Sequence, residues 1–354
     1  MAISMREVAK LAGVSSATVS RVINGSSLVT DETAERIRSI VRDLKFVPNN
    51  SALHFKQGKS QIYGVIIPDL TNPFFMELVK ILEELLIEND RELLVANTDF
   101  HSSRLQQSIQ RMLLRRVDGV AFPGSELESA SLESLVQNRI PVVTTDHFRT
   151  GPGISDIVVD FPGGMARMVR HLKDLGHSAI GFIGGTDGPA TSRVRRESFL
   201  DAIVKCGMSS REGWIVKGDY RIGGGSAAMA SILNCPERPT AVMTANDLSA
   251  IGALRTARDM GFRVPEDISV AGCDDIEIAD IMNPPLTTLR ISRRQYAEMI
   301  HDALRLGEKD LTQPGQVYRL PMNIVVRQST GPAPRSPNGK PSVKKARRST
   351  RKSS

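Results

Sequence analysis

Between residues 61 and 330 the sequence alternates short apolar runs with longer segments of helical hydrophobic spacing. The run over 62–67 is continuous, which is typical of a strand covered on both faces, and 74–89 has the spacing of a helix with one buried side. Strands that alternate with helices predict parallel sheets joined by right-handed crossovers. Further strands are predicted at 92–97, 118–123, 140–146, 156–160, 179–185, 214–218, 240–247, 268–275 and 287–291, and further helices at 103–115, 127–138, 163–175, 192–206, 223–233 and 247–260.

This alternation predicts an α/β fold in two lobes with parallel sheets. We expect lobe one over about 61–160 and lobe two over about 161–290. Residues 291–330 are expected to cross back and tie the lobes together, with a helix at 292–306 and a strand at 316–328. Because open parallel sheets bind ligands at the carboxyl ends of their strands, two such lobes in tandem place a ligand cleft between them.

The N-terminal stretch has a different pattern, that of two short helices with a tight turn between them. Ser4 is expected to cap the first helix, and Glu7 three residues later completes a capping box. Gly13 supplies the turn, because glycine tolerates a positive φ. The expected buried face of this first helix is Val8, Leu11 and Ala12.

The second helix is predicted over 16–24, with Ser15 as its cap and Val19, Val22 and Ile23 pointing inward. Small polar groups and one arginine on the outer side of a short helix suit the major groove of DNA. An ordinary helical hairpin inside a larger core is the alternative. The outward residues, and therefore the candidate base-reading residues, are Ser16, Ala17, Ser20 and Arg21.

A third helix is predicted over 31–45, with Thr30 as its N-cap, so that three short helices form one small all-α unit. Its basic residues are candidates for phosphate contacts, and solvated surface charge is the alternative for each of them. These residues are Arg36, Arg38, Arg42 and Lys45.

Charge is distributed unevenly along the 354 residues. The net charge is +7, but residues 1–60 carry +4, residues 331–354 carry +8 and the long middle carries −5. The two ends therefore suit a polyanion and the body does not. No apolar run approaches the roughly 20 residues that a membrane span needs, and no cleavable signal is visible. The three widely spaced cysteines fit a reducing cytoplasm.

The N-terminal sequence over 12–25, AGVSSATVSRVING, resembles the DNA-reading helix-turn-helix of the lactose/galactose repressor family of bacterial regulators. The resemblance to this family extends along nearly the whole chain. It implies a headpiece over 1–47, a hinge over 48–60 and a sensor similar to periplasmic sugar-binding proteins over 61–330. The region 331–354 has no apolar period and is expected to be a disordered basic tail. The implied protein is a cytoplasmic homodimeric repressor of a pseudo-palindromic double-stranded DNA operator.

The resemblance also implies a hinge helix that enters the minor groove. Asn49 and Ala52 match the family pattern there, whereas Leu53 stands in place of the usual arginine and Phe55 in place of a leucine. A phenylalanine can still wedge between base steps. A helix of about seven residues is not stable alone, and a plain linker is the alternative reading.

Polar residues follow several predicted strands, which suits groups that fix a ligand. Matched to the family, the effector pocket consists of Asn72, Phe74, Asp146, Arg195, Tyr220, Asn246 and Asp274. Asp247 and Asp275 also end predicted strands, and for them a role in capping helices or holding loops is the alternative. A sugar or sugar derivative is the expected effector, and a purine or nucleoside is the alternative.

Signatures of catalysis are weak. GFIGGTDG over 181–188 places glycines after a strand without matching a dinucleotide fingerprint, and the six histidines have no metal-ligand spacing. We therefore expect no enzyme activity, no cofactor and no metal. A carbohydrate-binding module without gene control is a further alternative, but such a module would lack the helix-turn-helix.

Overall fold

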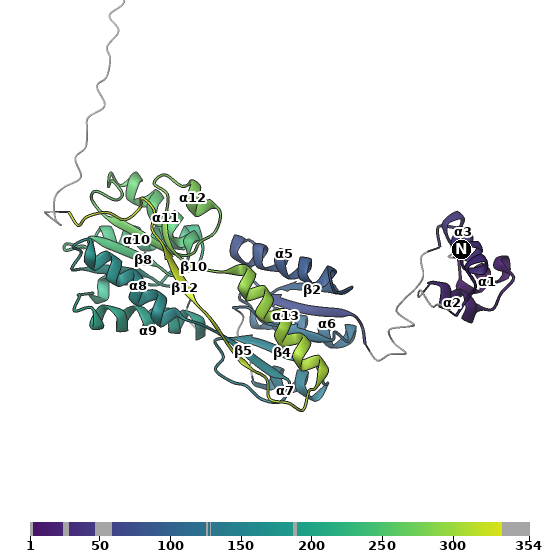
Figure 1. Cartoon of the computed structure of the whole chain (residues 1–354). Coiled ribbons are helices and arrows are strands. Elements are labelled where there is room, and N and C mark those ends of the chain that lie inside the picture. Colours follow the sequence, from purple (N-terminus) through teal and green to yellow (C-terminus); the bar gives the residue numbers. More distant parts are fainter. Residues whose placement is uncertain are drawn as a thin grey trace, which may run out of the picture. The chain divides into compact units, whose positions relative to one another are not determined.

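The computed structural model describes residues 3–23, 28–46, 59–124, 127, 129–186 and 190–334. The chain divides into two compact units, Met1–Ser60 and Gln61–Ser354, both of which are drawn in Figure 1. Each unit is described here by itself. The four predicted hinge residues, which remain a prediction because they lie outside the described residues, are Asn49, Ala52, Leu53 and Phe55.

The described part of the first unit has three helices, namely α1 (Met5–Ala12), α2 (Ser16–Ile23) and α3 (Asp31–Asp43). The predicted capping box is present, because the Ser4 hydroxyl accepts from the Glu7 amide and the Glu7 carboxylate accepts from the Ser4 amide. Gly13 has a φ of 65°, the left-handed conformation that the turn between α1 and α2 requires.

Apolar side chains from all three helices form the core of this unit. The prediction that Leu11 lies on the buried face is wrong. The buried stripe of α1 runs through Val8, Ala9 and Ala12 and leaves Leu11 62% exposed. Thr30 occupies the N-cap position of α3, as predicted, but its side chain makes no capping hydrogen bond.

The first lobe of the second unit is built on a six-stranded sheet with the order β11-β5-β4-β3-β1-β2. All neighbouring strands in it are parallel. Strands and helices alternate as predicted, in the order β1 (Ile62–Ile67), α5 (Pro73–Ile87), β2 (Glu92–Asn97), α6 (Ser102–Arg115), β3 (Gly119–Ala121), α7 (Ser129–Gln137), β4 (Val142–Thr145) and β5 (Ile154–Val159).

The second lobe repeats this scheme around a sheet with the order β12-β10-β9-β8-β6-β7. Only the pairing of β10 with β12 is antiparallel. Its elements are α8 (Phe161–Asp174), β6 (Ile180–Ile183), α9 (Ala190–Lys205), η1 (Glu212–Trp214), β7 (Ile215–Val216), α10 (Ile222–Leu233), β8 (Ala241–Thr244), α11 (Asp247–Asp259), β9 (Ser269–Asp274), α12 (Ile278–Ile281) and β10 (Thr287–Ile291).

Strand β1 shows why a continuous apolar run specifies this fold. Val65 and Ile67 belong to the same apolar cluster as Leu78 and Leu82 of α5, whereas Ile66 belongs to the cluster that includes residues of α6. Successive side chains point to opposite faces, and helices cover both. Within the described part of the chain, none of the helices has both the length and the apolar character that crossing a membrane requires.

The described chain passes between the lobes at three places. They are Asp160 between β5 and α8, Ser292 between β10 and α13 (Arg293–Lys309), and Pro321 between β11 (Val317–Leu320) and β12 (Met322–Val325). Figure 1 shows the last crossing as the yellow segment that runs from one lobe to the other. The prediction of one continuous strand over 316–328 is wrong, because Pro321 has no N–H to donate and the chain changes sheets at this residue.

The predicted basic tail begins too early. Residues 331–334 pack on the second lobe, where the Gly331 carbonyl lies 3.0 Å from His177 Nε2 and the Ala333 amide donates to the Leu175 carbonyl at 2.9 Å. These bonds give the segment a fixed place without any apolar periodicity in its sequence. Residues 335–354 lie outside the described part of the chain.

Candidate ligand cavity and nucleic-acid interface

Helix α2 presents the predicted face for contact with a nucleic acid. Ala17 and Arg21 are exposed, and Ser16 and Ser20 are half-buried on the same helix. Ser15 caps the helix, since its hydroxyl accepts from the Thr18 amide at 3.1 Å. The four predicted base-reading residues are therefore held on one short, capped helix whose opposite side is buried in the small core.

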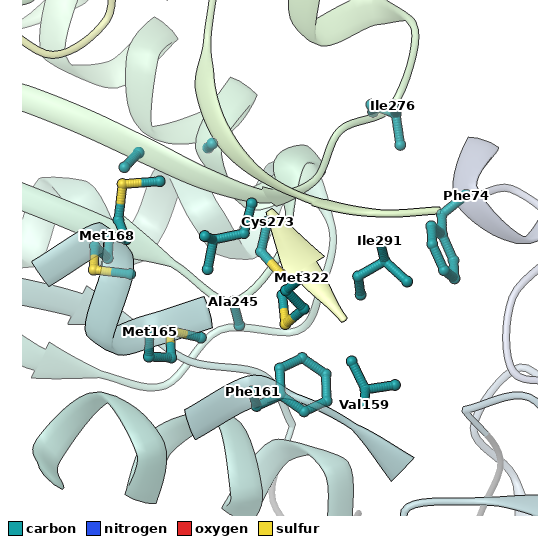
Figure 2. Packing of buried hydrophobic residues seen from close by; sticks show 14 of the residues in the cluster. Phe74, Val159, Phe161, Met165, Met168, Ala245, Cys273, Ile276, Ile291 and Met322 are labelled. Atoms are coloured by element: carbon teal, nitrogen blue, oxygen red, sulfur yellow. The ribbon is translucent and has the colours of Figure 1, made fainter. Parts of the chain in front are cut away.

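A cavity of about 50 Å³ lies between the two lobes of the second unit. All seven residues predicted for the effector pocket line it, four of them from lobe two and three from lobe one. Phe74, Val159, Phe161 and Ile291, which come from four different elements, converge on this region (Figure 2). The lining residues that sequence reasoning missed are Pro68, Phe75, Phe100, Gly124, Thr145, Val159, Phe161, Thr191, Ile291 and Tyr296.

Two of the predicted residues, Asn72 and Asn246, are also the N-caps of helices. Asn72 Oδ1 accepts from the Phe74 amide, and Asn246 Oδ1 accepts from the Ser249 amide, both at 3.0 Å. Asn246 Nδ2 donates to the Tyr220 carbonyl at 2.8 Å. These side chains therefore shape the strand ends at which the cavity forms, whatever they contribute to a ligand.

Three charged residues, which we call the cavity triad, face this space: Asp146, Arg195 and Asp274. The Arg195 guanidinium donates to the Ala245 carbonyl and lies 4.6 Å from the centre of the Phe161 ring. Its Nη1 atom is 3.7 Å from Asp274 Oδ1, which is too far for a hydrogen bond. Among the described residues, Asp146 Oδ2, Arg195 Nε and Asp274 Oδ1 are buried polar atoms without a hydrogen-bond partner.

Burial changes the acidity of both carboxylates. It raises the pKa of Asp146 to about 7, although the hydrogen bond from the Val159 amide and the charge of Arg195 lower it. Burial likewise raises the pKa of Asp274 to about 6, against the opposing charges of Arg195 and Arg293. Both carboxyl groups consequently take up a proton more readily than an exposed aspartate does, and a ligand meets them in either protonation state near neutral pH.

The backbone at the cavity is also unusual. Asp146, Tyr220 and Asp274 have φ values of 54°, 64° and 119°. Side-chain-bearing residues adopt such conformations at a cost, and they persist where the surrounding structure enforces them. Gly185, which follows β6, has a different reason for its identity, because a Cβ atom there would lie 2.1 Å from the Tyr220 ring. This glycine therefore makes room for an aromatic wall of the cavity.

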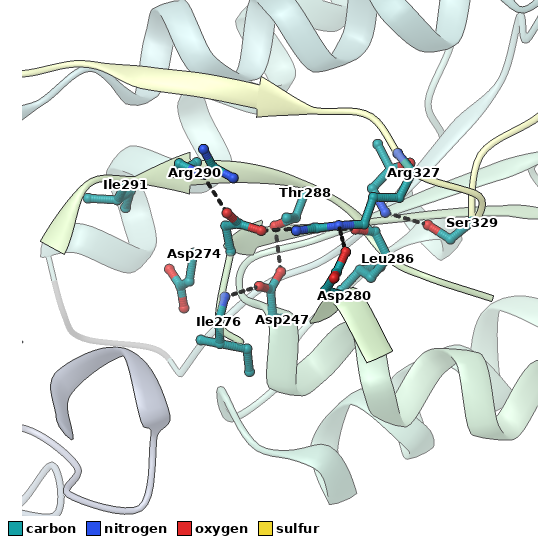
Figure 3. Close-up of polar contacts among 12 residues, drawn as sticks. Asp247, Asp274, Ile276, Asp280, Leu286, Thr288, Arg290, Ile291, Arg327 and Ser329 are labelled. Carbon is teal, nitrogen blue, oxygen red and sulfur yellow. Dashed lines mark hydrogen bonds and ion pairs between the residues drawn. The ribbon is translucent and has the colours of Figure 1, made fainter. Parts of the chain in front are cut away.

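The neighbouring aspartates, Asp247 and Asp275, make structural contacts, which was the alternative to a role in ligand binding. Asp247 accepts from the Ile276 amide at 2.9 Å and from the Thr288 hydroxyl at 2.6 Å, while Asp274 points away from this network (Figure 3). Asp275 pairs with Arg290 and Arg327 at 2.5 and 2.8 Å. Adjacent aspartates at the end of β9 thus face different surroundings, and only Asp274 lines the cavity.

Contacts between the lobes close the rim of the cavity. The rings of Phe100 from lobe one and Tyr220 from lobe two are stacked, with centroids 6.0 Å apart and planes inclined by 10°. Beside them, Arg221 of lobe two lies 2.5 Å from Asp99 and 3.6 Å from Asp69, both of lobe one. Sequence reasoning missed these two contacts between the lobes because it considered only polar residues at strand ends. The position of a residue at a strand end does not predict which residue of the other lobe it contacts.

A metal centre is not among the sites that the described residues form. They contain no group of three or more His, Cys, Asp or Glu side chains placed to hold a metal ion. The three cysteines are free thiols, and they are Cys206, Cys235 and Cys273.

A helix-turn-helix unit combined with a two-lobed binding unit defines a ligand-responsive DNA-binding regulator. Residues 4–49 match the bacterial regulatory proteins of the lacI family, and residues 169–330 match the periplasmic binding protein-like domain. The ribose operon repressor of Escherichia coli K12 is 34% identical to this chain over 317 residues, which cover 88% of this chain and 95% of the repressor. The chain belongs to the lacI family of bacterial regulatory proteins.

Solved structures agree with this assignment. The lac repressor dimer bound to operator and the anti-inducer ONPF has a TM-score of 0.83 at 25% identity, covering 94% of this chain and 100% of that one. A LacI family transcriptional regulator from Enterococcus faecalis V583 with bound ribose has a TM-score of 0.69 at 25% identity, covering 77% and 99%. The predicted fold class and family are confirmed, and the protein is a ligand-responsive, DNA-binding transcriptional repressor and not an enzyme.

Proposed function

We propose that this protein acts in the cytoplasm as a homodimeric repressor whose affinity for a pseudo-palindromic operator changes when a monosaccharide binds between the lobes. One observation carries the proposal: the seven residues predicted for the effector pocket all line one cavity at the junction of two lobes. Ligand control requires that the ligand bind two arrangements of the lobes with different affinity. A ligand that contacts both walls of the cavity meets this requirement.

The chemistry of the cavity favours a sugar. Six aromatic residues line it and offer flat apolar walls, while the cavity triad offers hydrogen-bonding atoms that lack a partner in the described protein. Buried polar atoms without partners are costly, and sugar hydroxyls can both donate to the carboxylates and accept from the guanidinium. A space of about 50 Å³ holds about three to five water molecules, which suits one small ring. The similar Enterococcus faecalis regulator was solved with ribose.

For DNA recognition we propose that Ser16, Ala17, Ser20 and Arg21 of α2 read the major groove. Arg21 is exposed and is the candidate for a guanine, because arginine pairs with the O6 and N7 acceptors of that base. Ser16 and Ala17 are short and can make only close, modest contacts. We further propose that the hinge contributes to selectivity in the minor groove through Asn49, Ala52, Leu53 and Phe55.

Thermal shift of the full chain tests the ligand. D-ribose, D-glucose, D-gluconate and adenosine are compared at equal concentration, and we expect D-ribose to raise the Tm most, because binding to the folded state alone stabilises it. Arg195→Ala should abolish this shift. Arg193→Ala, an exposed neighbour on the same helix, is the matched control and should keep it. A shift with adenosine alone would identify a nucleoside effector, and a shift that survives Arg195→Ala would contradict the assignment of the cavity.

DNA binding is tested with duplexes that the wild-type chain selects from a random pool. Arg21→Ala should weaken binding to the selected duplex by about 10-fold or more, since a bidentate base contact contributes about 1–3 kcal/mol of discrimination. Arg255→Ala is the control, because Arg255 is exposed on α11 of the second unit, where it lies 3.6 Å from Asp259. If Arg21→Ala lowers the affinity for the selected duplex and for an unrelated duplex by the same factor, Arg21 contacts only phosphate.

A further inference from the structure

A second cluster of buried charge lies at the end of the first lobe opposite to the strand ends that form the cavity. Arg91 pairs with Asp118 at 3.2 Å and with Glu308 at 2.7 Å, and the three side chains are 13%, 7% and 10% exposed. Glu308 also accepts from the Tyr63 hydroxyl at 2.6 Å, and the guanidinium lies 4.5 Å from the centre of the Tyr63 ring. We call Arg91, Asp118 and Glu308 the anchor cluster.

The anchor cluster holds Gln61, the first residue of the second unit. Asp118 Oδ2 accepts from the Gln61 amide at 2.8 Å, and the Gln61 carbonyl accepts from the Glu92 amide at 2.9 Å. The Asp118 amide in turn donates to the Ile62 carbonyl at 2.7 Å. Gln61 has a φ of 61°, a conformation that a non-glycine residue keeps only where its neighbours enforce it. Both peptide groups at the junction with the DNA-binding unit are therefore fixed to lobe one.

Helix α13 joins this anchor to the cavity. Glu308 stands near its end, whereas at its start Arg293 donates to the carbonyls of Asp274 and Asp275 at 2.9 and 2.8 Å and pairs with Glu77 of α5 at 2.7 Å. Arg293 thus touches both lobes beside a residue of the cavity triad. A helix of 17 residues spans about 25 Å at 1.5 Å per residue, and α13 packs along α5, β3, β4 and β5.

We propose that Arg91, Asp118 and Glu308 are positioning residues for ligand control of DNA binding. They fix the backbone of residue 61 to lobe one, so that a change in lobe arrangement at the cavity is passed through the rigid body of α13 and its sheet to the chain that enters the DNA-binding unit. None of the three residues lines the cavity. This inference rests on the proposed function and adds the residues through which the two activities are coupled.

The most informative variant changes the backbone at residue 61 and leaves the buried charges of the anchor cluster in place. In the full chain, Gln61→Pro removes the N–H that Asp118 accepts and forbids a positive φ. Gln61→Gly keeps both and is the matched control. We measure the Kd for a duplex selected by the wild type and for an unrelated duplex, without ligand and with D-ribose. D-ribose thermal shift in both variants checks that the sensor is intact.

We expect Gln61→Pro to reduce the preference for the selected duplex by about 10-fold or more, because the chain that enters the DNA-binding unit is then no longer held to lobe one at residue 61. An allosteric effector typically changes affinity by about 5- to 150-fold. In Gln61→Pro, D-ribose should change the affinity for the selected duplex by less than about twofold. Gln61→Gly should behave as wild type. A proline variant that keeps both selectivity and ligand response would overturn the proposal.

A second measurement is independent of DNA and ligand. Glu308→Gln weakens the ion pair with Arg91, which in turn pairs with Asp118, the acceptor of the Gln61 amide. If the cluster holds Gln61 through this series of contacts, amide hydrogen exchange at Gln61 should become at least about 10-fold faster. Unchanged exchange in a folded Glu308→Gln variant would refute the anchor. If the wild type selects no DNA sequence, the proposed function fails, and this exchange measurement still decides whether the cluster holds residue 61.

Discussion

The cavity triad and the anchor cluster are both sets of buried charge in one binding unit, but they differ in how fully they are satisfied. In the anchor cluster every ion pair is within 3.2 Å. In the cavity triad the nearest pair is 3.7 Å apart, and each of its three residues has a buried atom without a hydrogen-bond partner in the described chain. The first arrangement supports a fixed structure, and the second is complete only with a further polar partner.

Backbone geometry sharpens this contrast. Two of the three residues in the cavity triad, Asp146 and Asp274, have a positive φ, whereas no member of the anchor cluster is among the described residues with that conformation. Strain and unsatisfied groups reduce stability, and proteins retain them where binding requires them. The comparison therefore separates residues that face a ligand from residues that hold the chain in place, and each part of it can be tested.

The largest effect is expected at the anchor cluster. Asp118→Ala removes one partner of a buried pair and leaves Arg91 incompletely compensated, so the free energy of unfolding should fall by about 3–5 kcal/mol. Chemical denaturation monitored by circular dichroism measures the change. Asp43→Ala, at an exposed position of α3, should change the free energy of unfolding little. If Asp118→Ala is equally harmless, the paired cluster does not stabilise the fold.

Asp146→Asn should instead raise the free energy of unfolding. Because the pKa of Asp146 is raised to about 7 in the folded protein, the folded state holds more protons than the unfolded chain between about pH 4 and 7. Wild-type stability therefore falls as pH rises through that window. Asp146→Asn cannot ionise, so its advantage over wild type in the free energy of unfolding should grow from about 0.5 kcal/mol at pH 4 to about 4 kcal/mol at pH 8.

Denaturation curves for the two proteins at matched pH values give this difference directly. The comparison cancels the titration of all other groups that the two proteins share. A constant difference between pH 4 and 8 would mean that Asp146 titrates as an exposed aspartate does, and the distinction between the two clusters would then fail for this residue.

The smallest effect is expected at the rim of the cavity. Arg221 is half-exposed, and exposed ion pairs contribute only about 0–1 kcal/mol. Arg221→Ala should therefore leave the Tm nearly unchanged and weaken D-ribose binding by about two- to fivefold, because the closed arrangement of the lobes loses a contact. Arg211→Ala breaks a similarly exposed pair with Glu237, away from the cavity, and should not change the affinity. Calorimetric titration of both variants with D-ribose would show whether the rim contact has this role.

Sequence was a good guide where the signal is local. Apolar runs identified the strands, and family motifs identified cavity residues such as Asn72 and Asp274. It failed where two interacting residues are far apart in the sequence. Arg91 and Glu308 are 217 positions apart, and the residues around each give no indication of the other. Leu11 was misplaced because a helix of eight residues can set its buried stripe on either of two overlapping faces.

The crossing at Pro321 has a consequence for how the protein is made. Strand β11 is the edge of one sheet and β12 the edge of the other, although they are adjacent in the chain and are the last two strands described. While the protein is synthesised, both sheets therefore lack an edge strand until residues 317–325 have emerged. Unpaired edges invite association with other chains, so a product that stops before residue 317 would expose two such edges at once.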